Sequence, residues 1–263
     1  MSSESMGRGV LHPAQAATRF SLNRHAPAPA VATFVDYYWI VQWDLTGLPH
    51  YDQKILPHPN VHLVFEDGLT GVHGVDPGLF VRRVHVAGHV LGVRFLPGGF
   101  RPFWDRPVAE LTGQTLPAAD LFGPAALDTE RAVLSTQDES QMVARANTFM
   151  LSVLPERDPL AEEVAAMVHH IVTDPALTRV DQLVSTLGVP ARRLQRLFAE
   201  YVGVSPKWVL RRARLHEAHE RADRGAGLDW AALAADLGYA DQAHLTRDFT
   251  ATIGEPPARY AAV

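Results

Sequence analysis

The strongest constraint on the fold is a pattern that occurs twice in the last third of the chain. Leucines, a glycine, Arg-x-Phe and a late Gly and Pro recur in residues 182–209 and 232–260. The matched pairs are Leu183/Leu233, Leu187/Leu237 and Gly188/Gly238 at an offset of 50, and Leu194/Leu245, Arg196/Arg247, Phe198/Phe249, Gly203/Gly254 and Pro206/Pro257 at an offset of 51. Such self-similarity predicts two copies of one supersecondary unit.

Each copy has the pattern of a helix, a tight turn and a second helix. In the first copy, Thr178 with Asp181 three residues later has the capping-box spacing, and Gly188 suits a helix end because glycine tolerates positive φ. In the second copy, Asp229 and Asp241 are the expected N-caps. The predicted buried positions are Val180, Leu183, Val184, Leu187, Leu194, Leu197, Phe198 and Tyr201, then Trp230, Leu233, Ala234, Leu237, Leu245 and Phe249.

The outward face of each second helix carries side chains able to pair with base edges. Arg192, Gln195 and Arg196 share one face in the first copy, and Gln242, Thr246 and Arg247 share one face in the second. Arginine bonds bidentately to guanine and glutamine to adenine, as a helix-turn-helix requires in the major groove. The alternative is a helical hairpin whose polar face is only solvated. Two copies with turn residues at matched positions disfavour this alternative.

A long helix is predicted between the copies. Ser205 is the expected N-cap, Pro206 suits the first turn, and nothing breaks the helix before Gly225. Such a helix spans roughly 25 Å, whereas successive major grooves on one DNA face lie about 34 Å apart. Two interpretations of its arginines stay open, phosphate contact or ion pairing with Glu217 or Asp223; the arginines are Arg211, Arg212 and Arg214.

Residues from about 160 to 263 resemble the DNA-binding domain of the AraC/XylS family of transcription regulators. The matching stretches are "LGVPARRLQRLFAEYVGVSP", "RRARLHEA" and "DLGYADQAHLTRDFTATIGEPPARY". The resemblance implies base reading by Arg192, Gln195 and Arg196, and by Gln242, Ala243, Thr246 and Arg247. The chain departs from the family at Pro190, where Ser is usual, and at Ala243, which offers only a methyl contact.

The first 110 residues or so read as an antiparallel β unit, because apolar runs at 31–45, 59–66, 79–87 and 90–96 are separated by turn residues. From about Pro124 the pattern is helical, so the expected class is α+β, with a β-rich unit followed by an all-α unit. The expected divisions are a sensor or dimerisation unit at 1–125, a helical linker at 126–158 and the DNA-binding unit at 159–263. The segment from "ILPHPNVHLVFEDG" to "RPFWDRPVAEL" resembles the cupin-like domain that precedes some AraC-type domains.

A metal-dependent cupin-type enzyme is the rival hypothesis. Alternation in a strand over 58–66 places His58, His62 and Glu66 on one face, with His85 and His89 one strand later. However, an i, i+4 pair along a strand is about 13 Å apart, too far for one metal. A polar outer face is therefore preferred, and we expect no metal, no cofactor and no catalytic residue.

An effector pocket in the β unit is a further hypothesis. Trp39, Arg94 and Phe95 are the candidate lining residues, although core packing explains the aromatic side chains equally well. An arginine within an apolar strand needs a partner. An internal carboxylate is preferred over an anionic ligand as the partner of Arg94.

The distribution of charge agrees with a DNA-binding second half. The chain carries a formal net charge of −5, but residues 178–263 hold 12 basic and 10 acidic groups, and residues 1–177 hold 12 and 19. The sequence has no cysteine and no long apolar segment, so we expect a cytoplasmic protein without a membrane span. Expected partners are double-stranded DNA and, as possibilities, RNA polymerase, a small-molecule effector and a second copy of the chain.

One apolar stripe bears on the second copy. It fits either a dimer seam or packing within its own unit, and the second is preferred; its residues are Val143, Ala146, Met150 and Leu154.

Overall fold

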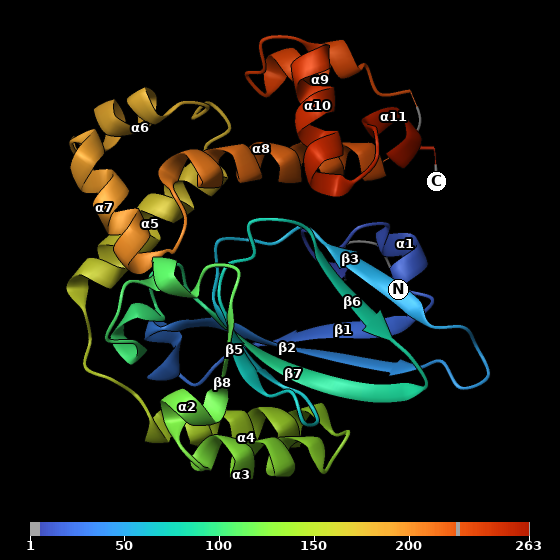
Figure 1. The fold of residues 1–263 in the computed structure, drawn as a ribbon, viewed down its shortest axis with the longest axis vertical. Coiled ribbons are helices and arrows are strands. Elements are labelled where there is room, and N and C mark those ends of the chain that lie inside the picture. The colour runs from blue at the N-terminus through green and yellow to red at the C-terminus, as the bar shows by residue number, and fades with distance from the viewer. Residues whose placement is uncertain (1–5, 225–226, 263) are drawn as a thin grey trace.

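The computed structural model describes residues 6–224 and 227–262, which form a β unit followed by a helical unit (Figure 1). The β unit contains eight named strands, and every named element after β8 is a helix. The predicted α+β class, with the β part first, is confirmed. None of the described helices is both long enough and apolar enough to cross a membrane.

The β unit is built on one antiparallel sheet. Its strand order is β1 (Phe20–His25), β2 (Val35–Asp44), β7 (Ala87–Phe95), β4 (His62–Phe65), β5 (Gly71–His73) and β8 (Thr115–Pro117). A separate two-stranded ribbon pairs β3 (Tyr51–Ile55) with β6 (Phe80–Val84). The four predicted apolar runs correspond to β2, β4, β6 and β7, whereas β1, β3, β5 and β8 were not predicted.

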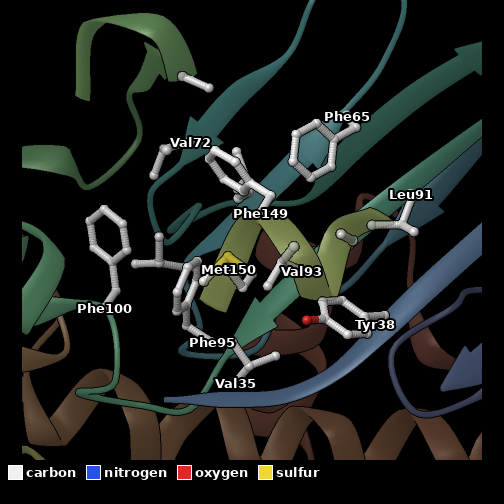
Figure 2. Close-up of a cluster of buried hydrophobic side chains, with 14 of the residues drawn as sticks. Val35, Tyr38, Phe65, Val72, Leu91, Val93, Phe95, Phe100, Phe149 and Met150 are labelled. Atoms are coloured by element: carbon white, nitrogen blue, oxygen red, sulfur yellow. The ribbon is translucent and has the colours of Figure 1, made fainter. Parts of the chain in front are cut away.

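One face of the sheet carries the core of the β unit (Figure 2). Alternation along β2 and β7 turns Tyr38, Leu91 and Val93 toward Phe149 and Met150 of helix α4. The helices on this side are α2 (Ala118–Phe122), α3 (Ala125–Leu134) and α4 (Glu139–Ser152). The smaller elements of the β unit are α1 (Pro13–Ala16), on the other side of the sheet, and the 3-10 turns η2 (Val31–Thr33), η3 (Arg101–Phe103) and η4 (Val108–Leu111).

The predicted linker at 126–158 therefore contributes to the first core. Ala146 and Met150 are fully buried there, and Val143 and Leu154 pack partly against it. The apolar stripe of α4 packs within its own unit, as the preferred alternative stated.

The helical unit is organised around α8. Its helices are α5 (Pro159–Thr173), α6 (Val180–Leu187), α7 (Ala191–Tyr201), α8 (Pro206–Asp223), α9 (Trp230–Asp236), α10 (Gln242–Ile253) and α11 (Pro257–Tyr260). Near its start α8 places Val209 and Leu210 in the core of the first repeat, and further along it places Leu215, Ala218 and Ala222 in the core of the second. The predicted cap is confirmed, because the Ser205 hydroxyl accepts from Trp208 N, and Pro206 begins the helix.

The β unit docks along a third side of α8 (Figure 1). The fully buried Arg212 donates to the carbonyls of Pro77 at 2.7 Å and Gly78 at 3.2 Å. The His58 ring stacks on the His216 ring, with centroids 4.0 Å apart and planes inclined by 10°. Leu11 of the N-terminal segment enters the core of the second repeat. The two units thus share apolar cores as well as polar contacts.

The interface imposes an electrostatic cost on its histidines. Burial, followed by the charge of Arg94, lowers the pKa of His58 well below 6.5. Burial, followed by His58, lowers the pKa of His216 in the same direction. The other groups facing His216 are Arg8 of the N-terminal segment and Arg212 and His219 of α8, all basic. Both stacked rings are therefore neutral when the units are docked.

We expect the docking of the two units to weaken in acid. A histidine whose pKa is lowered in the docked state contributes its full stability above about pH 6.5, and loses about 1.4 kcal/mol for each pH unit below that value. Protection factors for amide hydrogen exchange, corrected for the intrinsic rate at each pH, should therefore fall at residues 56–61 and along α8 between pH 7.5 and 5.5. The double substitution His58→Phe/His216→Phe keeps stacked rings and should flatten this dependence, whereas His169→Phe, at an exposed site on α5, should leave it unchanged. An equally steep dependence in the double variant would contradict the assignment.

Candidate nucleic-acid interface

The two repeats place α7 and α10 as matched helices, which we call the first and second reader helices. The first buries Leu194, Leu197 and Phe198, and the second buries Leu245, Phe249 and Ile253. Because these apolar residues occupy one side of each helix, the polar residues between them face outward. The predicted helix-turn-helix geometry is present in both copies. Five of the predicted buried residues are only partly buried, namely Val180, Val184, Leu187, Tyr201 and Trp230.

The turns before the reader helices have the predicted glycine geometry. Gly188 has φ 64° and Gly238 has φ 68°, both in the left-handed region. The second reader begins with the predicted cap, in which the Asp241 carboxylate accepts from His244 N at 2.7 Å. The first reader has Pro190 at the N-cap and no side-chain cap. The two reader helices therefore differ in their N-caps, as expected from the presence of Pro190 where Ser is usual in the family.

One predicted cap is wrong by a single residue. The N-cap of α6 is Arg179, not Thr178, and Asp181 does not complete a capping box. Instead, Gln182 Oε1 accepts from Thr178 N at 3.0 Å and from Arg179 N at 2.9 Å, while Asp181 pairs with Arg179. Glutamine is as suitable as an acid for this reach back to the cap, so spacing alone did not distinguish the two registers. Asp229 caps α9 as predicted.

The outward side chains of the reader helices are exposed. The predicted residues with exposed side chains are Arg192, Gln195, Arg196, Gln242, Ala243 and Arg247, and Thr246 is partly buried. Within residues 6–224 and 227–262, neither the reader arginines nor the two glutamines have a hydrogen-bond or ion-pair partner. Their donors are available to a ligand outside the chain.

The arginines of α8 are used internally instead. Arg211 pairs with Asp248, Arg212 donates to the β unit, and Arg214 lies 4.4 Å from the centre of the Tyr239 ring. The structural interpretation of these arginines holds, but the predicted partners are wrong. Glu217 is instead paired with Arg8 and Arg221, and Asp223 accepts from Tyr260. Sequence spacing along α8 could show only the i, i+4 pair Glu217–Arg221, because the other partners come from other elements.

Two further side chains of the reader helices escaped the sequence analysis. Arg193 on α7 and His244 on α10 are exposed beside the predicted reading residues. His244 is held edge-on against Tyr239, with ring centroids 5.1 Å apart. The signal that would have found them is their position in the first turn of each reader, where groove-binding helices contact DNA.

The predicted effector residues do not form one pocket. Phe95 is fully buried in the core of the β unit, whereas Trp39 and Arg94 lie on the opposite face of the sheet. Trp39 donates to His62 Nδ1 at 3.1 Å, and Arg94 donates to Asn60 Oδ1 at 2.9 Å. Strand alternation separates neighbours such as Arg94 and Phe95, which the three-residue hypothesis overlooked.

The preferred partner of Arg94, an internal carboxylate, is present. Its Nε lies 3.4 Å from Asp36 Oδ2, and the guanidinium also stands 5.0 Å from the centre of the Tyr37 ring. A separate hollow of about 280 Å³ lies between the β unit and α5, lined by Phe34, Leu96 and Ala161 among others. Arg157 and Glu162 also border this hollow and are paired with each other.

Three of the residues considered for a metal site serve other contacts. His58 stacks on His216, His62 accepts from Trp39, and Glu66 pairs with Arg82. In the part of the chain that the structure describes, no three His, Asp or Glu side chains are grouped so that they could hold a metal ion. Burial, followed by the charge of Arg94, lowers the pKa of His62 to about 3, so this ring is neutral.

The two turn glycines should differ in their tolerance of alanine. At Gly188 nothing lies within 4 Å of an added Cβ, so Gly188→Ala should cost only the backbone strain of about 1 kcal/mol in free energy of unfolding. At Gly238 the Cβ would lie 2.6 Å from Thr178 Cγ2, so Gly238→Ala should cost about 2 kcal/mol or more. Urea unfolding of the full chain measures both; equal costs would contradict the contact between Thr178 and the second turn.

Comparisons with known proteins agree with this architecture. Residues 23–117 match a domain of unknown function, DUF6597, and residues 183–262 match a helix-turn-helix domain of the AraC type. No curated protein matches the sequence. A structure of ToxT from Vibrio cholerae is 11% identical over 93% of this chain and 98% of that chain, with a TM-score of 0.35. A structure of unsaturated fatty acid bound ToxT from the same organism is 12% identical, over 93% and 95%, with a TM-score of 0.33.

The likeness to ToxT is too weak to support a statement about ligands, so the assignment rests on the helix-turn-helix match. The matched range contains both reader helices and the helix that joins them. The chain is a DNA-binding transcription regulator whose residues 183–262 match a helix-turn-helix domain of the AraC type, with an N-terminal β-sheet unit before it.

Proposed function

We propose that the regulator reads two successive major-groove segments of double-stranded DNA, one with each reader helix. The observation that carries the proposal is the pair of outward faces whose arginines and glutamines have no partner among the described residues. The 18 residues of α8 join the two readers over roughly 27 Å. That length suits two helices that enter adjacent grooves on one face of the duplex, about 34 Å apart.

Each reader supplies a different kind of contact. Arg192 and Arg196 present guanidinium groups to guanine edges, and Gln195 presents an amide to adenine. On the second reader, Gln242 and Arg247 have the same capacities. Ala243 and Thr246 offer methyl contacts to thymine, although Thr246 is partly buried. Arg193 and His244 add donors at the first turn of each reader, where phosphates lie closest.

The β unit is proposed to modulate DNA binding. Its contacts with both repeats support this role: Thr112 Oγ1 donates to Gly203 O at 2.7 Å in the first repeat, and His12 N donates to Tyr260 Oη at 3.0 Å in the second. A small-molecule effector that altered the β unit would therefore act on both readers. RNA polymerase and a second copy of the chain remain proposed partners, in the cytoplasm.

Selection of double-stranded DNA from a random pool tests the proposal directly. Full-length protein at near-physiological salt should recover a motif with two short boxes about one helical turn apart. A single box would contradict the two-reader arrangement. Recovery of no motif with folded protein, followed by the same result with residues 159–263 alone, would overturn base reading altogether.

Substitutions on the readers test the individual contacts. Arg196→Ala or Gln242→Ala should cost about 1–3 kcal/mol in binding free energy on the selected site, because each removes a base contact. The loss should shrink when the corresponding base pair is changed. Arg259→Ala and Gln141→Ala are matched controls on exposed surfaces away from the readers. An equal loss on every DNA sequence would instead indicate contact with phosphate.

A further inference from the structure

The second reader carries one buried acid, Asp248, beside the exposed Arg247. Its side chain is only 9% exposed and points away from the outward face, toward α8 and the turn before α10. Arg211 of α8 pairs with one carboxylate oxygen, and Tyr239 Oη donates to the other at 2.8 Å. The carboxylate therefore links three elements: the reader α10, the helix α8 and the turn between α9 and α10.

Neighbouring contacts extend this link. Arg214, one turn along α8 from Arg211, lies over the Tyr239 ring at 4.4 Å and donates to Gly238 O at 3.5 Å. Burial, followed by the charge of Asp248, raises the pKa of Tyr239, so its hydroxyl stays a donor. We call Arg211, Arg214, Tyr239 and Asp248 the reader anchor. Charge-assisted hydrogen bonds depend on direction, so the reader anchor fixes the rotation of α10 as well as its distance from α8.

The first repeat has no such anchor. At the offset of 51, Asp248 corresponds to the buried Leu197, and at the offset of 50, Tyr239 corresponds to Val189. The first reader is held from outside instead, where Tyr201 Oη donates to Asp158 Oδ2 at 2.8 Å at the start of α5. Glu200 at the same end pairs with Arg101 of the β unit at 2.7 Å. The same position is the apolar Leu197 in the first repeat and the charged Asp248, which links three elements, in the second. This difference indicates a requirement specific to the second reader.

We propose that Asp248 is a positioning residue for base recognition by the second reader. It holds α10 at a set rotation relative to α8, so that Gln242 and Arg247 meet the second box while the first reader occupies the first. Asp248 itself does not contact DNA. It also keeps Arg211, which is 43% exposed, paired within the protein rather than with phosphate. This inference rests on the proposed function, namely that the second reader recognises bases.

The test compares two DNA duplexes at fixed salt: the selected two-box site, and the same site with its second box scrambled. For full-length wild-type protein, the ratio of the two affinities measures recognition of the second box. Asp248→Asn keeps the shape but removes the charge, and Tyr239→Phe removes one hydroxyl. Asp248→Leu reproduces the residue of the first repeat. Asp236→Asn, at a 62% exposed acid on α9 that pairs with Arg221, is the matched control.

The expected result is a selective loss. Asp248→Asn should lower affinity for the two-box site about tenfold, because it weakens the contacts with both Arg211 and Tyr239, and Tyr239→Phe should lower it about threefold, because it removes only one of them. Neither should change affinity for the scrambled site, which depends on the first reader and on phosphates. Asp248→Leu should bind the two duplexes equally, and Asp236→Asn should behave as wild type.

Three outcomes separate the possible failures. If wild-type protein does not distinguish the two duplexes, the proposed function fails for the second reader. If wild type distinguishes them and Asp248→Asn and Asp248→Leu do so equally well, the positioning role is overturned. If the Asp248 variants lose affinity equally for both duplexes while circular dichroism shows a folded protein, Asp248 supports the domain in general, and the specific role is also overturned.

Discussion

The architecture depends on helix α8, which is buried on three sides by different parts of the chain. Helix α8 buries Val209 and Leu210 against the first repeat and Leu215 and Ala218 against the second. Its third side receives the β unit through Arg212. An amphipathic helix normally buries a single stripe, with the rest of its surface polar and solvated. Here three stripes are covered, which makes α8 a common reference for both readers and for the β unit.

The polar groups on the side of α8 that faces the β unit explain why this interface is stabilised by hydrogen bonds and is also sensitive to pH. Burial lowers the pKa of Arg212 to about 10, yet the guanidinium keeps two backbone carbonyl acceptors. The stacked rings of His58 and His216 contribute contact area only while they are neutral. A fully apolar interface would not respond to pH, whereas the charged groups that lower the pKa of His216 here are all basic. The composition of the interface is thus suited to a reversible contact.

Much of the fold could be predicted from local patterns, and the failures have a common cause. The repeat, the glycine turns and the caps at Ser205, Asp229 and Asp241 depend on residues close in sequence, and they were predicted correctly. The short strands β1, β3, β5 and β8 were missed because each is stabilised mainly by its neighbour in the sheet. Phe95 was grouped with Trp39 and Arg94 because a list of aromatic and charged residues ignores strand alternation. Contacts between units, such as Leu11 in the core of the second repeat, leave no periodic signal at all.

The use of arginine in the helical unit gives the physical basis for specificity in a chain of net negative charge. Non-specific affinity for DNA grows with the number of unpaired cations near phosphates. Residues 178–263 exceed neutrality by only two charges, and the arginines of α8 are paired internally. In the proposed DNA complex, the unpartnered arginines of the reader helices are therefore concentrated where base edges lie. Because few cations remain for phosphates elsewhere, the proposal requires that a larger share of the binding free energy comes from the readers, and the rotation of each reader then determines how much of it is realised.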